Sequence, residues 1–152
     1  MQTRYKSRLL RLAAAVLMLV ALMVSAADYR QLVDGVAIYF GVMPAELVRG
    51  HPREHPESAM HGGVPVGENH IMVALFDDKT GERITTAEVT ATITGPGSFR
   101  AEKKLETMVI AGSTTYGNYF SLLGPGPYRI AVRIRAPGVS HDIQTVFTWS
   151  RS

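Results

Sequence analysis

The chain of 152 residues contains no cysteine. Without disulfides, only packing can hold the fold together, and without thiolates the chain can build no Cys-based zinc site, blue-copper site or iron–sulfur cluster. It also lacks a phosphate-binding loop, a dinucleotide fingerprint, a nucleophile elbow and a paired-histidine helix motif. A catalytic triad is defined by geometry and cannot be excluded this way. We nevertheless expect a protein that is not an enzyme.

The chain also lacks an apolar run long enough to cross a bilayer comfortably. Its longest apolar stretch, Leu12 to Val24, follows a basic head that runs from Arg4 to Arg11. Small residues come next and offer cleavage after Ala26 or Ala27. This pattern predicts a secretory signal peptide over residues 1–27, export to the periplasm and a mature domain over residues 28–152. A retained membrane anchor is the alternative.

Little net charge remains in the mature chain. The full sequence has 16 basic and 13 acidic residues, a formal net charge of +3. Removing the four basic residues of the signal leaves 12 against 13, a net charge of −1. No Lys/Arg cluster remains that would follow a phosphate backbone, so no nucleic-acid partner is expected.

The mature chain has almost no helical periodicity, and short β-rich runs alternate with Gly/Pro turns. This pattern favours an all-β fold, an immunoglobulin-like antiparallel β-sandwich of about seven strands, with a small barrel as the competing architecture. Residues 28–34 are interpreted as a polar lead-in, and residues 45–48 as one helical turn or an extended segment. The expected strands cover residues 35–42, 70–76, 88–94, 104–110, 115–122, 128–135 and 143–150.

Four of the five histidines and two methionines gather between positions 51 and 72. Prolines and glycines separate most of them, which predicts a loop over residues 51–69. Imidazole and thioether are neutral ligands that suit copper, and imidazole also suits iron, zinc and nickel. The stretch is therefore a candidate metal-binding segment, although a solvated polar loop would have the same composition. Its candidate ligands are His51, His55, Met60, His61, His70 and Met72.

His70 and Met72 lie in the strand that follows this loop. Ile71, Val73 and Leu75 form the more apolar face of that strand, so His70 and Met72 share the opposite face, about 7 Å apart at two strand steps. Elsewhere, a mid-strand methionine such as Met108 is most often core filler. His141 is a lone loop histidine, which is more often solvated than a ligand.

A resemblance to a known protein family adds to the interpretation of these residues as metal ligands. The run MVIAGSTTYGN at 108–118 and the run GPGPYRI at 124–130 resemble segments of the periplasmic Fe2+ transport protein family of bacterial ferrous-iron uptake. The strand HIMVA at 70–74 resembles a His-Leu-Glu-Ala strand of that family, and GVAIY at 35–39 resembles its first strand. The resemblance covers most of the domain.

This resemblance implies an immunoglobulin-like sandwich, often a homodimer, with a copper or iron site built from a carboxylate, a methionine and histidines. It implies Met108 as the methionine ligand. Met72 occupies the carboxylate position, and Thr115 replaces the histidine that precedes Tyr-Gly. His141 lies in the region of the family's last histidine.

Exchanging a hard carboxylate for a thioether softens the site, so Met72, Met108 and one or two histidines would favour Cu(I) over Fe(II). His70 could serve as a ligand, and histidines of the loop could replace the missing one. We therefore expect a periplasmic metal-binding protein for copper or iron in uptake or delivery, with an inner-membrane permease or a metal-receiving protein as partner. The alternative is an interaction or structural module in which both methionines are core.

Overall fold

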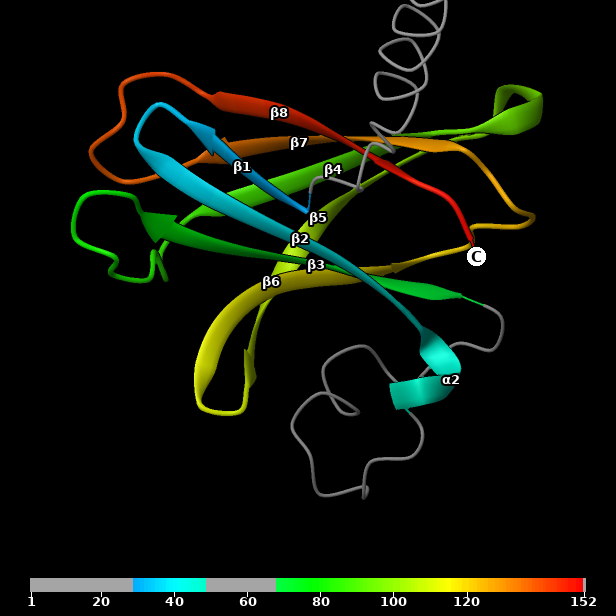
Figure 1. Ribbon diagram of the computed structural model, residues 1–152, viewed down its shortest axis with the longest axis horizontal. Coiled ribbons are helices and arrows are strands. Elements are labelled where there is room, and N and C mark those ends of the chain that lie inside the picture. The colour runs from blue at the N-terminus through cyan, green and yellow to red at the C-terminus, as the bar shows by residue number, and fades with distance from the viewer. Residues whose placement is uncertain (1–28, 49–67, 152) are drawn as a thin grey trace, which may run out of the picture.

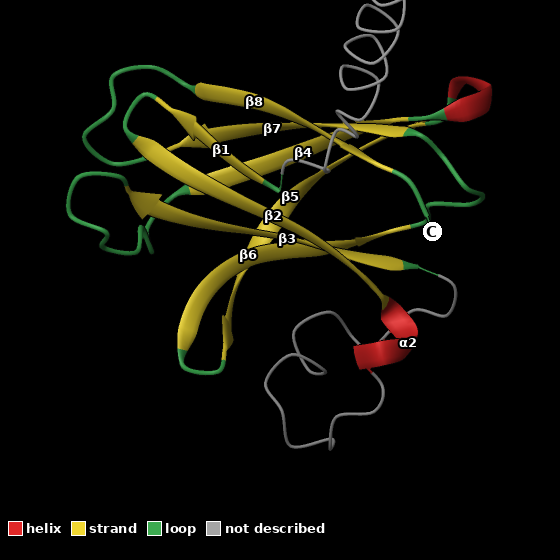
Figure 2. Cartoon of the chain, viewed as in Figure 1, coloured by secondary structure: helices red, strands yellow, loops and turns green. Residues whose placement is uncertain are grey.

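The computed structural model describes residues 29–48 and 68–151, and this part of the chain is almost entirely β-structure (Figures 1 and 2). No helix in the described part is long and apolar enough to cross a membrane. A single helical turn, α2 (Ala45–Val48), follows β2, and a short 3-10 turn, η1 (Pro96–Ser98), follows β4. The strands are β1 (Arg30–Val33), β2 (Val36–Pro44), β3 (Asn69–Asp77), β4 (Glu88–Thr94), β5 (Arg100–Ile110), β6 (Ser113–Phe120), β7 (Tyr128–Arg135) and β8 (Ile143–Trp149).

The strands form one antiparallel sheet in the order β1-β2-β3-β6-β5-β4-β7-β8, and this sheet curls until its two ends are neighbours (Figure 1). The side chain of Gln31 on β1 joins the ends. Its Nε2 donates to the carbonyl oxygen of Val146 on β8 at 2.9 Å, and its Oε1 accepts a hydrogen bond from the hydroxyl of Thr145. The expected all-β antiparallel class is therefore confirmed, with an almost closed sheet that combines features of the sandwich and the barrel.

The core lies inside the curled sheet and is built from inward-facing residues of β2 to β8. Ile71, Val73 and Leu75 of β3 are fully buried there, as the alternation of that strand predicts. The phenol hydroxyl of Tyr116 hydrogen-bonds two backbone groups of the segment before β4. It donates to the carbonyl of Ile84 and accepts from the amide of Ala87. The remaining residues of β3 that alternate with the core set belong to the outer face of the sheet.

The structure corrects the expected lead-in at residues 28–34, because β1 occupies most of it. β1 contains no buried residue, so it lacks the apolar alternation that would mark a strand. The missed signal was the turn. Asp34 and Gly35 both have positive φ, at 51° and 78°, between the paired residues Val33 and Val36. That is the two-residue Asp-Gly hairpin turn with the twist that antiparallel strands prefer.

Candidate metal centre

Three neighbouring strands place the candidate ligands on the outer face of the sheet. Directly opposite residues of an antiparallel pair point to the same side. Gly41 of β2, Met72 of β3, Gly117 of β6 and Glu106 of β5 are successive cross-strand partners, so they form one row across the sheet. Met72 therefore lies between two glycines, Gly41 on β2 and Gly117 on β6.

His70 belongs to the next row of this outer face. Its cross-strand partners are Met43 on β2 and Tyr119 on β6. The imidazole stacks on the Tyr119 ring with 4.6 Å between centroids and an interplanar angle of 25°, and only 2% of the residue is exposed. Stacking and burial hold the imidazole in one orientation. Its nitrogens therefore have defined positions, unlike those of a solvated histidine side chain.

Met108 on β5 lies opposite Thr115 of β6, on the same outer face as Met72. Its residue is 1% exposed, yet it does not belong to the cluster of buried residues that forms the core. Met108 is thus buried, as its interpretation as core filler requires, but it lies outside the main cluster of core residues. Its neighbours are the residues of the outer face.

The glycine at position 117 explains how these side chains meet. A Cβ atom at Gly117 would lie 2.8 Å from Nε2 of His70 and 3.0 Å from Cε of Met108. Two atoms that approach the same point this closely are neighbours, and no alanine could occupy that point without displacing them. At Gly41, a Cβ atom would lie at an ordinary 3.7 Å from Cε of Met72. Gly117 therefore provides the space in which an imidazole and a thioether come together.

A shallow groove of about 440 Å³ runs over this face and is lined by Met72, Gly41 and Thr115. Met72 is half-buried and lines this groove, whereas His70 and Met108 are buried and do not line it. Arg83 borders the groove: its guanidinium lies 4.5 Å from the Phe76 ring centroid, and it donates to the carbonyl of Thr114.

The donor set is poor in hard ligands. Across residues 29–48 and 68–151, no three His, Asp or Glu side chains lie together in a way that could hold a metal ion. The cluster instead offers one imidazole and the thioethers of Met72 and Met108. Neutral nitrogen and sulfur donors of this kind fit a soft monovalent ion, Cu(I), better than Fe(II) or Mn(II).

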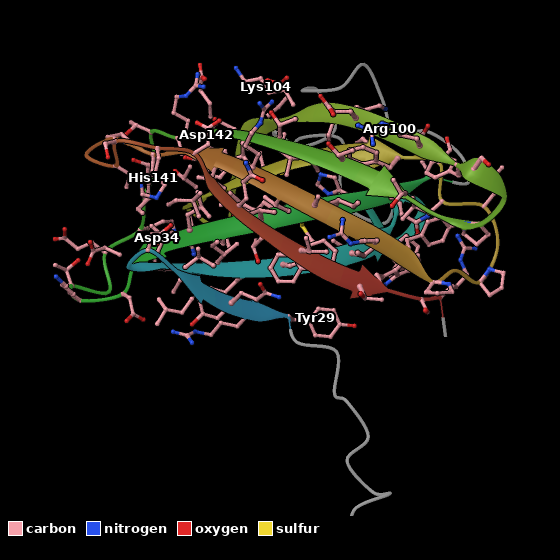
Figure 3. All side chains as sticks on the ribbon, turned by 90° about the horizontal axis from the view of Figure 1, so that it is seen from above. Tyr29, Asp34, Arg100, Lys104, His141 and Asp142 are labelled. Atoms are coloured by element: carbon pink, nitrogen blue, oxygen red, sulfur yellow. The ribbon has the colours of Figure 1, made fainter. Side chains whose placement is uncertain are left out.

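His141 lies elsewhere, in the loop between β7 and β8. Its Nε2 is 3.0 Å from a carboxylate oxygen of Asp34, in the β1–β2 turn, and the imidazole is 60% exposed (Figure 3). The structure thus brings His70 and Met108 close together at Gly117, places Met72 in the same cross-strand row as Gly117, and gives His141 a different partner. The remaining candidates, His51, His55, Met60 and His61, lie outside the described residues, as does the predicted signal peptide at 1–27.

Sequence reasoning missed two glycines and a methionine of this face. Gly117 lies within the Tyr-Gly-Asn run that carries the family resemblance, so its signal was present but its role depends on the β3–β6 register. Gly41 and Met43 were assigned to a strand and its end, without a face. Only the pairing of β2 with β3 shows that Met43 lies opposite His70.

Sequence comparison finds no matching family model and no matching curated protein. Comparison of structures does find neighbours. FetP from uropathogenic Escherichia coli strain F11, expressed in the periplasm of E. coli, matches with a TM-score of 0.60 and 15% identity over 83% of this chain and 96% of FetP. Copper-reconstituted P19 from Campylobacter jejuni matches with a TM-score of 0.64 and 12% identity over 81% of this chain and 92% of P19.

A third neighbour is a DUF4426 family protein from Pseudomonas aeruginosa, with a TM-score of 0.63 and 11% identity over 80% of this chain and 94% of that protein. At sequence identities this low, the structural similarity establishes a shared fold alone. The distant resemblance to small periplasmic metal-binding proteins that the sequence suggests is therefore confirmed at the level of the fold: this chain is built like FetP and P19.

Proposed function

We propose that this chain is a non-catalytic periplasmic metal-binding protein that holds Cu(I) with His70, Met72 and Met108, on an immunoglobulin-like domain. One observation carries the proposal: Nε2 of His70 and Cε of Met108 converge on the space left by Gly117, in the same row as Met72. The buried imidazole of His70, the nearby thioether of Met108 and the thioether of Met72 on the same face would form a soft, neutral donor set. Such a set stabilises Cu(I) without requiring a carboxylate.

Two differences from the periplasmic Fe2+ transport protein family support copper, rather than iron, as the metal that this chain binds. Met72 stands where the family has a carboxylate, and Thr115 stands where it has a histidine. Both changes remove harder donors from the face that Met72 and Met108 share. Ferrous iron, which prefers oxygen and nitrogen ligands, would lose the donor that holds it best.

The structural neighbours support copper as the bound metal and the periplasm as the location of the protein. The P19 structure was reconstituted with copper, and FetP was produced in the periplasm. Together with the predicted signal peptide at residues 1–27, they support a periplasmic location for this chain. We further propose that the protein acts in metal uptake or delivery, that an inner-membrane permease or a metal-receiving protein takes the ion from it, and that it works as a homodimer.

A competition titration tests the metal site. The mature domain, beginning at Asp28 and free of any histidine tag, is titrated with Cu(I) against a chromogenic chelator under reducing conditions. We expect stoichiometric binding and a loss of affinity in Met72→Leu and in Met108→Leu. Leucine conserves volume, so each variant should lose less than about 1.5 kcal/mol of stability. Unchanged affinity in both variants would refute the proposed ligands and favour the interaction-module alternative.

A further inference from the structure

One end of the curled sheet opens into a cavity that the three proposed copper ligands do not line. β2 ends at this cavity with Pro44, β3 begins there with Asn69, and β8 ends there with Trp149. In Figure 1, the end of the chain after β8 lies beside the beginning of β3. The cavity has a volume of about 520 Å³, which is within the range of small-molecule sites, and the mouths of β-barrels are places where such sites often occur.

Aromatic side chains form part of the cavity wall, and buried rings hold them in place. Tyr29 stacks on the buried Phe40, with 6.3 Å between ring centroids and an interplanar angle of 9°. Trp149 packs against the buried Tyr128, with 5.9 Å between ring centroids. Figure 3 shows Tyr29 beside the end of β8, and 49% of this residue is exposed, so part of its ring is open to a ligand. The remaining apolar lining is Val42 and Pro44.

A buried amide in this wall lacks a partner. Asn69 takes an inward position of β3, two residues before the core residue Ile71. Only 1% of Asn69 is exposed, and within the described part of the chain its Nδ2 has no hydrogen-bond partner. Such atoms are rare in proteins, because an unpaired buried donor costs free energy. The terminal torsion of an asparagine side chain is soft, so the amide can turn this donor towards an acceptor in the cavity.

Arg151 brings a positive charge to the same cavity. Its Nη2 donates to the carbonyl of Leu122 at 3.0 Å, and its backbone N–H donates to the carbonyl of Pro125 at 2.9 Å. A guanidinium has five N–H donors, so this arrangement leaves others for a ligand. Within residues 29–48 and 68–151, no carboxylate lies within ion-pair distance of Arg151.

The polar lining of the cavity therefore favours an acceptor that carries negative charge. Ser150 adds a hydroxyl, and no Asp or Glu is found among the described residues that line the cavity. Glu68, which precedes Asn69 in sequence, accepts a hydrogen bond from the hydroxyl of Ser121 at 2.9 Å and does not line the cavity. An apolar wall thus lies next to a cation and a buried donor, with no acidic group between them.

We propose that this cavity binds a small aromatic carboxylate. The ring of the ligand packs on Tyr29 and Trp149, and its carboxylate accepts hydrogen bonds from Arg151 and Asn69. A guanidinium can bind a carboxylate through two parallel hydrogen bonds. A phosphate group carries nearly twice the charge and matches a single guanidinium less well. The inference requires no metal and does not depend on the proposed function.

Trp149 makes the test simple, because it is the only tryptophan of the chain and its fluorescence reports on ligands that enter the cavity. The metal-free mature domain is titrated with 3-phenylpropionate. The ligand controls are its uncharged analogue, 3-phenylpropanamide, and propionate, which lacks the ring. We expect saturable binding of 3-phenylpropionate, about tenfold weaker binding of the amide, and no saturable binding of propionate in the same concentration range.

Two variants of lining residues test the polar contacts. Arg151→Gln should lose about tenfold in affinity for 3-phenylpropionate and should bind the acid and the amide equally. Asn69→Leu should also weaken binding of the acid, while its thermal unfolding midpoint equals or exceeds that of the unaltered protein, since leucine removes an unpaired buried donor. Arg129→Gln is the charge-matched control, because Arg129 is an exposed cation on the outer face of β7, and it should retain the affinity.

The absence of saturable binding, or equal affinities of the unaltered protein for the acid and the amide, would overturn the proposal. An unchanged affinity in Arg151→Gln would overturn it as well, and thermal unfolding verifies that this variant, which alters an exposed side chain, is folded. Tighter binding of an N-acetylated dipeptide that ends in phenylalanine would replace the small molecule with the carboxyl end of a protein chain as the occupant.

Discussion

His70 and Met108 meet over a residue that has no side chain. The imidazole Nε2 and the thioether Cε lie 2.8 Å and 3.0 Å from the position where Gly117 would carry a Cβ atom. Because β3, β6 and β5 are adjacent, residues separated by 38 positions in sequence become neighbours on one face. The metal-binding proposal depends on this contact.

The first prediction concerns Gly117. The Cβ of Gly117→Ala would press on His70, on Met108 and on the backbone carbonyl of Ile71, so we expect a Cu(I) affinity at least about tenfold weaker and a stability loss of about 1–3 kcal/mol, as for overpacked sites. Gly41→Ala is the matched control, because its Cβ would meet Met72 at an ordinary contact distance. Chelator competition and thermal unfolding measure both effects. Equal Cu(I) affinity in the two variants would contradict the role of Gly117.

Met43 leads to a second prediction. It lies directly opposite His70 on the outer face and is half-buried, so its thioether is placed to act as a further sulfur donor. We expect Met43→Leu to weaken Cu(I) binding, but less than Met108→Leu does. The same competition titration ranks the two variants. A Met43→Leu protein that binds Cu(I) as the unaltered protein does would limit the donor set to His70, Met72 and Met108.

The histidines give a third prediction. His141→Asn should leave Cu(I) affinity unchanged, because its imidazole is exposed and lies beside Asp34. His70→Asn should weaken binding strongly, since it removes the buried imidazole next to Met108. Circular dichroism verifies the fold of His70→Asn, which also loses stacking on Tyr119. If His141→Asn were the more damaging variant, the ligand set would have to be built around the β7–β8 loop.

A fourth prediction concerns acid stability. The pKa of Asp77 is lowered because the backbone N–H groups of Thr80 and Lys79 donate to its carboxylate, at 2.8 and 2.9 Å. This contribution is present above the ordinary aspartate pKa of 3.8 and is lost as the pH falls through the lower folded value. We therefore expect Asp77→Asn to flatten the decline in unfolding midpoint in that acidic range.

Glu82→Gln serves as the control for this measurement, because it removes a carboxylate from the same turn without removing the acceptor of the two N–H groups. Its acid profile should follow that of the unaltered protein. A profile of Asp77→Asn that also follows the unaltered protein would show that the Asp77 carboxylate does not contribute to stability through these hydrogen bonds.

Much of the fold is predictable from this sequence because local residue patterns indicate most of its strands. The alternation in β7, with Tyr128, Ile130 and Val132 inward and Arg129 and Arg133 outward, was sufficient to assign a strand and its faces. β1 was not predictable by that route, because it buries no residue. Its only local signal was the Asp34-Gly35 turn, and closure of the sheet depends on Gln31, whose partners lie more than a hundred residues away.

The candidate site was predictable only in part. The two-residue periodicity of a strand placed His70 and Met72 on one face, but the register that brings Met108 and Gly117 to them is a property of the assembled sheet. The resemblance singled out Met108 and also suggested His141, whose ring lies beside Asp34 in the structure. The ligand roles of His51, His55, Met60 and His61 stay predictions, and the His141→Asn variant tests that of His141.

The most direct test of the central claim is X-ray absorption at the copper edge of the Cu(I)-loaded mature domain. The account predicts a first shell with both sulfur and imidazole nitrogen scatterers, and the loss of one sulfur in Met108→Leu with the imidazole contribution retained. A first shell of nitrogen and oxygen alone, unchanged by Met108→Leu, would contradict a site built from His70, Met72 and Met108.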